Sequence, residues 1–180
     1  MKQVFQMNEE KTEKILSLFF ENPTREFHLR EISALIKVSP ATVSRRLKKF
    51  IFLKILSVKK NKPILEVNAN LESKIFLEAK KNYYLRKIKE SGLLDFLIEA
   101  YNYPETIVLF GSYAKGEDTE KSDIDMAIIT EKKLNLDLDN FEKRLKRKIH
   151  ILEIKRKEIK PTLMNNLANG IVLYGYLKVR

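Results

Sequence analysis

Two aspartates and a glycine-serine turn lie close together in the stretch LFGSYAKGEDTEKSDIDMAII, residues 109–129. Asp123 and Asp125 are two positions apart at the start of an apolar run. Because neighbouring carboxylates repel each other and lose hydration when buried, such a pair is costly unless a cation binds between them. A divalent metal ion is the obvious candidate. In the alternative interpretation, the two acids only cap a loop at the start of a strand.

The residues around this pair predict the elements that position it. Residues 106–110 read as an unbroken apolar strand, 111–116 as a turn, and 123–129 as a second strand. Side chains alternate along a strand, so Asp123 and Asp125 fall on the same face. The two carboxylates are therefore able to share one metal ion.

The turn before them has the composition of a phosphate-binding loop. Gly111 lets the backbone approach a phosphate closely, and Ser112 adds a hydroxyl group and an amide donor. Lys115 either adds a positive charge or is simply solvated, and Gly116 completes the GSxxxG pattern. A phosphate-binding turn joined to a carboxylate pair is what phosphoryl or nucleotidyl transfer requires.

The whole pattern, a strand with GS followed by SDxD on another apolar strand, closely resembles the nucleotidyltransferase superfamily of DNA polymerase beta. The resemblance covers residues 93–176 and is closest to the minimal nucleotidyltransferases of prokaryotes and the kanamycin nucleotidyltransferase type. It implies that a nucleoside triphosphate, with ATP expected, is held by Gly111, Ser112, Lys115 and Gly116. It also implies that Asp123 and Asp125 bind Mg²⁺ or Mn²⁺.

The third carboxylate of that family, a metal ligand and base on the next strand, has no counterpart here. The strand expected at 148–154 carries His150 at the aligned position, and Glu153 is expected on the opposite face. A neutral His150 is able to ligate a metal or accept a proton, which would make it catalytic. The alternatives are a site that binds nucleotide without catalysis, and a histidine that only packs in the sheet.

The first part of the chain carries most of the positive charge. The formal net charge is +11, and residues 1–70 contain 14 Lys and Arg against 7 Asp and Glu. Residues 101–180 contain 15 against 12. This asymmetry favours a polyanionic partner for the N-terminal part, nucleic acid rather than membrane. A generally basic surface without a specific partner is the alternative.

Helical periodicity predicts helices at 8–20, 27–36 and 39–52, followed by strands at 55–58 and 64–67 around a basic hairpin tip. The stretch EISALIKVSPATVSRRLKKF resembles the helix-turn-helix of winged-helix transcription regulators. Double-stranded DNA is the partner that this resemblance implies. It places at the DNA Ser39, Thr42, Arg45, Arg46 and Lys49 from the recognition helix, with Lys59, Lys60 and Lys62 on the wing. The alternative is a solvated helix face in a protein-interaction domain.

We therefore expect an α+β protein in three parts: a winged helix-turn-helix DNA-binding domain at 1–70, a helical linker at 71–92, and a small mixed-sheet α/β nucleotidyltransferase domain at 93–180. The expected activity is metal-dependent transfer of a nucleoside monophosphate from a triphosphate to an acceptor. The alternative is a DNA-binding transcriptional regulator whose degenerate transferase domain only binds nucleotide or dimerises.

The composition excludes several kinds of site and of protein. The absence of Cys excludes disulfides and cysteine-based zinc sites. No apolar window is long enough to cross a membrane and no signal peptide is recognisable, so we expect a cytoplasmic protein. The resemblance to the minimal nucleotidyltransferases implies a prokaryotic one. The resemblance allows a toxin-like protein partner as acceptor. The small size of the catalytic domain indicates that such a partner or a homodimer completes the site.

Overall fold

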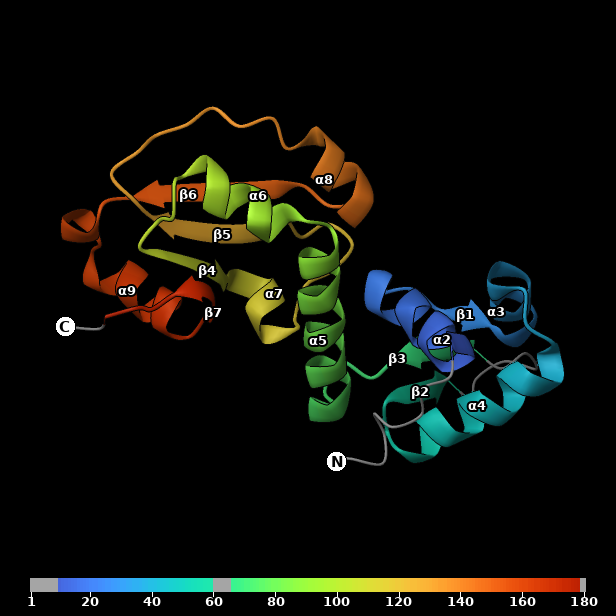
Figure 1. Ribbon diagram of the computed structural model, residues 1–180. Helices are drawn as coiled ribbons and strands as arrows, with labels where there is room; N and C mark the ends of the chain where they lie inside the picture. Colours follow the sequence, from blue (N-terminus) through green and yellow to red (C-terminus); the bar gives the residue numbers. More distant parts are fainter. Residues whose placement is uncertain (1–9, 60–65, 179–180) are drawn as a thin grey trace. The chain divides into compact units, whose positions relative to one another are not determined.

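The computed structural model describes residues 10–59 and 66–178. The chain divides into two compact units, Met1–Lys80 and Lys81–Arg180 (Figure 1). Each unit combines helices with a small β-sheet, so the expected α+β class is confirmed at that level. The hairpin tip, with Lys60 and Lys62, lies outside the described residues.

The described residues of the first unit form three helices and a three-stranded antiparallel sheet, followed by the start of a further helix at Lys74. The helices are α2 (Glu10–Glu21), α3 (Leu29–Ile36) and α4 (Pro40–Phe52). The strands are β1 (Phe27–His28), β2 (Leu56–Lys59) and β3 (Glu66–Ala69), in the order β1-β3-β2. Their apolar faces meet in a core of fully buried side chains that includes Phe19, Phe27, Ile32, Val43 and Val67.

Local sequence signals explain where α4 begins. Ser39 is the N-cap, and its Oγ accepts a hydrogen bond from the backbone N–H of Thr42 at 3.4 Å. Pro40 occupies the first helical position, where its missing N–H costs nothing and its fixed φ suits the helix. The preceding helix α3 ends at Lys37, which takes the left-handed conformation with φ 54°.

The prediction of a helix at 27–36 is wrong for its first two residues. Phe27 and His28 form β1, which pairs with Val67 and Glu66 of β3, and the helix begins only at Leu29. Phe27 is fully buried and packs edge-on against Phe19 with ring centroids 5.2 Å apart. Burial against a distant strand therefore outweighs the local helical pattern.

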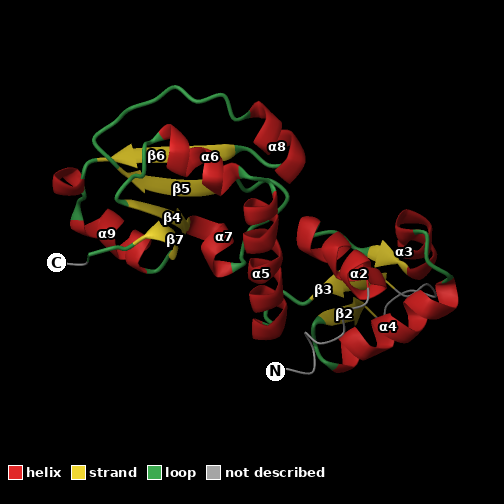
Figure 2. Cartoon of the chain, in the orientation of Figure 1, coloured by secondary structure: helices red, strands yellow, loops and turns green. Residues whose placement is uncertain are grey.

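A four-stranded mixed sheet forms the centre of the second unit (Figure 2). Its strands are β4 (Thr106–Phe110), β5 (Ile124–Ile129), β6 (Ile149–Ile154) and β7 (Ile171–Gly175), in the order β6-β5-β4-β7. Strands β5 and β6 are parallel, whereas β4 is antiparallel to both β5 and β7. The ends of β4 and the starts of β5 and β6 therefore lie along one edge of the sheet.

Helices precede and connect these strands. They are α5 (Lys74–Glu90), which contains the boundary between the units, α6 (Leu93–Ala100), α7 (Gly111–Lys115), α8 (Asp139–Leu145), the 3₁₀ turn η1 (Arg156–Glu158) and α9 (Pro161–Ala168). The chain breaks between α5 and α6 at Gly92, which adopts φ 78°.

The two faces of this sheet have different surroundings. On one face, Val108 and Ala127 pack with Leu167 of α9 in a fully buried cluster, and Leu152 lies against it. The neighbouring Glu153 points to the other face, where its carboxylate accepts a hydrogen bond from the hydroxyl of Tyr101 at 2.6 Å. Among the described residues, no helix has the length and apolar character required to cross a membrane.

We predict that Leu167→Ala lowers the free energy of unfolding by about 3 kcal/mol, because it leaves a cavity in a fully buried cluster. Leu134→Ala is the matched control, since Leu134 is 38% exposed. Urea unfolding followed by circular dichroism measures both variants. Equal losses of stability would contradict the assignment of Leu167 to the core of the second unit.

Candidate nucleotidyl transfer site

The glycine-serine turn and the carboxylates meet because β4 and β5 are paired. Phe110, the last residue of β4, lies opposite Asp125 in the antiparallel register. Gly111 follows at once and opens α7, which is a short helix where the sequence suggested a turn. The chain therefore brings Gly111 and Asp125, separated by a polar loop in sequence, to one edge of the sheet.

Gly111 is in direct contact with the carboxylate of Asp125. A Cβ atom at position 111 would lie 2.8 Å from Oδ2 of Asp125, closer than a real side chain tolerates. Gly111 also adopts φ 72°, in the left-handed region that favours glycine. The left-handed backbone thus favours glycine at position 111, and a Cβ there would also force the Asp125 carboxylate to shift.

His150 is the third polar group at this edge. Parallel pairing of β5 with β6 sets His150 beside Asp125, and its Nδ1 lies 3.3 Å from Oδ1 of that aspartate. The side chain of His150 is 66% exposed and that of Asp125 is 31% exposed, so both are accessible to a ligand. Asp123, just before β5, is exposed.

Glu153, expected to be a poor substitute for the missing third carboxylate, is hydrogen-bonded away from Asp125. Its carboxylate accepts hydrogen bonds from the Tyr101 hydroxyl and from the backbone N–H of Leu134, at 2.6 and 2.7 Å. Burial, followed by the hydrogen bond to Glu153, raises the pKa of Tyr101. The Glu153 carboxylate therefore lies on the opposite face of the sheet from Asp125 and His150.

The donor set at this edge suits a magnesium-type ion. Within residues 10–59 and 66–178, no group of three or more His, Asp or Glu side chains is arranged to hold a metal ion. Mg²⁺ is commonly held by one or two carboxylates together with water and substrate phosphates, rather than by a complete protein cage. The carboxylates of Asp123 and Asp125 fit that pattern.

A cavity of about 610 Å³ adjoins the turn and is lined by Phe110, Gly111, Lys115, Asn166 and Asn169. We call it the Gly111 cavity. Of the residues expected to hold nucleotide, Gly111 and Lys115 line it, whereas Ser112 and Gly116 do not. The sequence reasoning missed Asn166 and Asn169. The signal available in the sequence was the i, i+3 spacing of two amides, Asn166 on α9 and Asn169 at its C-cap.

A buried polar cluster supports the loop between the turn and the carboxylates. Asp118 and Tyr113 are each 1% exposed. Burial and then the nearby Asp118 raise the pKa of Tyr113. Burial lowers the pKa of Arg147, but Tyr113, Tyr84 and Asp118 outweigh it, so the net shift is upward. This cluster was not expected from the sequence.

Only some of the residues expected to contact DNA are exposed. Arg45 and Lys49 of α4 are exposed, and the hydroxyl of Ser39 donates to that of Thr42 at 3.0 Å. The expectation that Arg46 faces outward is wrong, because it is only 8% exposed and donates a hydrogen bond to the buried Thr12 of α2. Lys59 forms an ion pair with Glu26.

Comparison with known proteins agrees with the geometry of the second unit. Residues 94–177 match the model of the family described as polymerase beta, nucleotidyltransferase. The match supports the nucleotidyltransferase domain expected in the C-terminal part, and with it a nucleoside triphosphate as substrate. No curated protein and no solved structure matches the chain.

We predict that Gly111→Ala destabilises the protein more than Gly92→Ala does. Both variants place a Cβ on a left-handed residue, which costs about 1 kcal/mol. Only at Gly111 does the new atom also meet a carboxylate, because nothing lies within 4 Å of a Cβ at Gly92. Thermal unfolding of the two variants measures the difference. Equal Tm values would contradict the close contact between Gly111 and Asp125.

Proposed function

We propose that the second unit is a metal-dependent nucleotidyltransferase that transfers a nucleoside monophosphate from a triphosphate, ATP in the first instance, to an acceptor hydroxyl. The observation that carries this proposal is the contact of Gly111 with Asp125 beside the Gly111 cavity. It unites a phosphate-binding turn with a carboxylate pair, the combination that nucleotidyl transfer requires.

Each residue of the site has a role in this reaction. Gly111, Ser112, Lys115 and Gly116 hold and orient the phosphates. Asp123 and Asp125 provide the carboxylate oxygens for Mg²⁺ or Mn²⁺. The bound ion would neutralise phosphate charge and polarise the reacting phosphoryl group. The acceptor oxygen then bonds to the α-phosphorus as the bond from that phosphorus to the pyrophosphate oxygen breaks.

His150 occupies the position where a third carboxylate is expected. With Nδ1–H donating to Asp125, the lone pair belongs to Nε2, on a side chain that is largely exposed. Nε2 is then available to accept the proton of the acceptor hydroxyl. Asp125 would orient the imidazole in this arrangement, as a carboxylate does in other proton-transfer pairs.

The first unit is proposed to bind double-stranded DNA as a winged helix. Ser39 and Thr42 lie at the N-terminal end of α4, and the exposed Arg45 and Lys49 would contact phosphates. Arg46 is removed from this set, because its buried contact with Thr12 gives it a structural role. The proposed domains remain 1–70, 71–92 and 93–180.

A second candidate function is a DNA-binding regulator whose transferase domain binds nucleotide without catalysis. The specific observation in its favour is that a histidine, rather than a carboxylate, stands beside Asp125. Either proposal is compatible with a protein partner or a homodimer that completes the site.

We predict that Mg²⁺ with ATP raises the Tm of the wild-type protein but not of Asp125→Asn, because the amide removes one carboxylate ligand. At a ligand concentration of about 100 times Kd, the stabilisation is about 2.7 kcal/mol. Asp95→Asn is the control, because Asp95 is exposed on α6. Chelation of the metal should abolish the stabilisation. An equal rise in the Tm of Asp125→Asn would contradict the proposed metal site.

We also predict that Arg45→Ala combined with Lys49→Ala weakens duplex DNA binding and lowers the slope of log K against log salt by about 2, one for each lost phosphate contact. Lys132→Ala with Lys133→Ala removes the same charge from an exposed loop of the second unit and is the control. Fluorescence anisotropy with a labelled duplex provides the readout. Unchanged affinity and slope would dismiss α4 as the recognition helix.

A further inference from the structure

The end of helix α9 forms one wall of the Gly111 cavity. Leu167 of this helix is fully buried in the core cluster of the second unit. A Cβ atom at position 170 would lie 2.6 Å from the backbone oxygen of Leu109, so Gly170 allows the chain after α9 to pass close to β4. The end of the helix is thereby fixed next to the glycine-serine turn. With it are fixed Asn166 and Asn169, which line the cavity.

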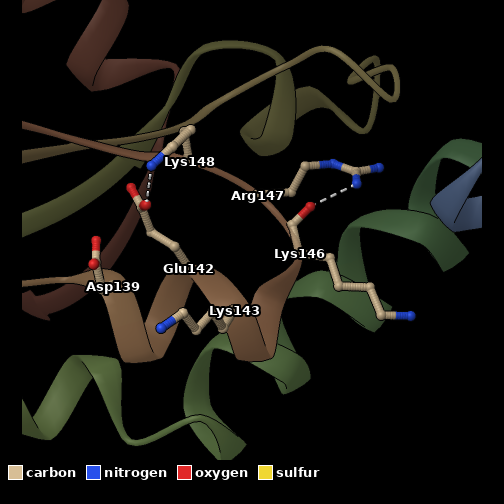
Figure 3. Close-up of a pocket in the computed structure, with 6 residues that line it drawn as sticks. All are labelled: Asp139, Glu142, Lys143, Lys146, Arg147 and Lys148. Carbon is tan, nitrogen blue, oxygen red and sulfur yellow. Dashed lines mark hydrogen bonds and ion pairs between the residues drawn. The ribbon is translucent and has the colours of Figure 1, made fainter.

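A second pocket of this unit has a different character. Each residue that lines it carries a charge, as Figure 3 shows for Asp139, Glu142, Lys143, Lys146, Arg147 and Lys148. Two of these charges are paired with each other, since Glu142 accepts a hydrogen bond from the ammonium group of Lys148 at 2.5 Å. Such a lining suits anions and presents neither an amide nor an aromatic ring to a nucleobase. The Gly111 cavity, which has both, is therefore the better site for a base.

The walls of the Gly111 cavity differ in charge. Gly111 and Lys115 belong to α7, and Gly111 adjoins the Asp125 carboxylate that would hold the metal ion. This wall suits the phosphates. The opposing contribution comes from the C-terminal end of α9, where backbone carbonyls carry partial negative charge. A phosphate is repelled there, whereas the amino group of a base is attracted. Phe110 adds an aromatic ring, the kind of group on which bases stack.

The side-chain amide of Asn169 is held in one orientation. Its Nδ2 donates a hydrogen bond to the backbone carbonyl of Asn165 at 2.8 Å. Rotation of the amide by half a turn would bring Oδ1 against that carbonyl oxygen, and two acceptors repel each other. The amide nitrogen carries two hydrogens, so its second N–H and Oδ1 are available to a ligand. Asn169 therefore presents a donor and an acceptor side by side in a fixed order.

We infer that Asn169 is a specificity-determining residue that selects adenine over 6-oxopurines in the triphosphate. This inference rests on the proposed function. Adenine presents its 6-amino donor next to the acceptor N7, the pattern that an asparagine amide pairs with through two hydrogen bonds. Guanine and hypoxanthine carry an acceptor oxygen in place of that amino group. This oxygen would face Oδ1 of Asn169, and the anchored amide cannot turn to suit it.

The selectivity that Asn169 provides is moderate, because its side chain is exposed and water hydrates groups that stay unpaired. A buried site rejects an analogue that leaves its polar groups unpaired far more strongly. One net hydrogen bond corresponds to roughly a tenfold change in Kd. The preference acts on binding of the triphosphate, since the base takes no part in the bonds that form and break at the α-phosphorus.

The test compares ATP with inosine triphosphate, in which an oxygen replaces the 6-amino group and N1 carries a proton. Calorimetry with Mg²⁺ gives the Kd of each nucleotide for the full chain, for Asn169→Ala and for the control Asn165→Ala. Asn165 is an exposed asparagine of the same helix that does not line the cavity, and the substitution keeps its backbone carbonyl. Because the readout is a ratio of two Kd values on one protein, a general loss of triphosphate affinity cancels.

We expect the wild-type protein and Asn165→Ala to bind ATP about tenfold more tightly than inosine triphosphate, and Asn169→Ala to bind the two within about twofold of each other. A preference that persists in Asn169→Ala would overturn this inference, even if the affinity for both nucleotides falls, because the amide would then contact the sugar or the phosphates. Equal binding of both nucleotides by the wild-type protein would also overturn it and leave the proposed nucleotide site intact. Failure of the wild-type protein to bind either triphosphate would remove the proposed function itself.

Discussion

The antiparallel pairing of β4 with β5 is the interaction on which the rest of the candidate site depends. It sets Phe110 opposite Asp125, so the turn that follows one strand meets the carboxylates that open the next. A slip of one residue would turn Asp125 to the other face and bring Ile124 into its place. The register is secured by burial, because β4 and most of β5 are apolar and almost completely covered. Hydrophobic packing thus positions the polar groups.

Parallel pairing of β6 extends this arrangement to His150 and to Lys148. The same register that sets His150 beside Asp125 sets Lys148 beside Asp123. One sheet edge therefore carries a glycine turn, two carboxylates, an imidazole and a group of cations in order across three strands.

Features with a strong local signal were predictable from the sequence. The strand at 106–110 is uniformly apolar, Ser39-Pro40 marks the start of α4, and Gly92 separates α5 from α6. The closeness of Gly111 and Asp125 followed from the motif that joins them. That a Cβ at position 111 would meet this carboxylate could be seen only from the register of the pairing.

Features that depend on distant partners were not predictable. Arg46 has the sequence context of an exposed cation, but α2 supplies the buried Thr12 that it contacts. Phe27 and His28 continue a helical pattern, yet they pair with β3. The cluster of Asp118, Tyr113 and Arg147 joins α7 and the loop after it to the segment before β6. In each case the deciding partner is far away in the sequence.

The most direct test of the central claim is isothermal titration calorimetry of ATP into the full chain, with Mg²⁺ or Mn²⁺ and after chelation. The protein in which Asp123 and Asp125 are both replaced by Ala is titrated in parallel. A working site predicts saturable binding that requires the metal and disappears in the double variant. Binding that persists in the double variant, or no binding by the wild-type protein, would contradict a metal-dependent nucleotide site at the edge of this sheet.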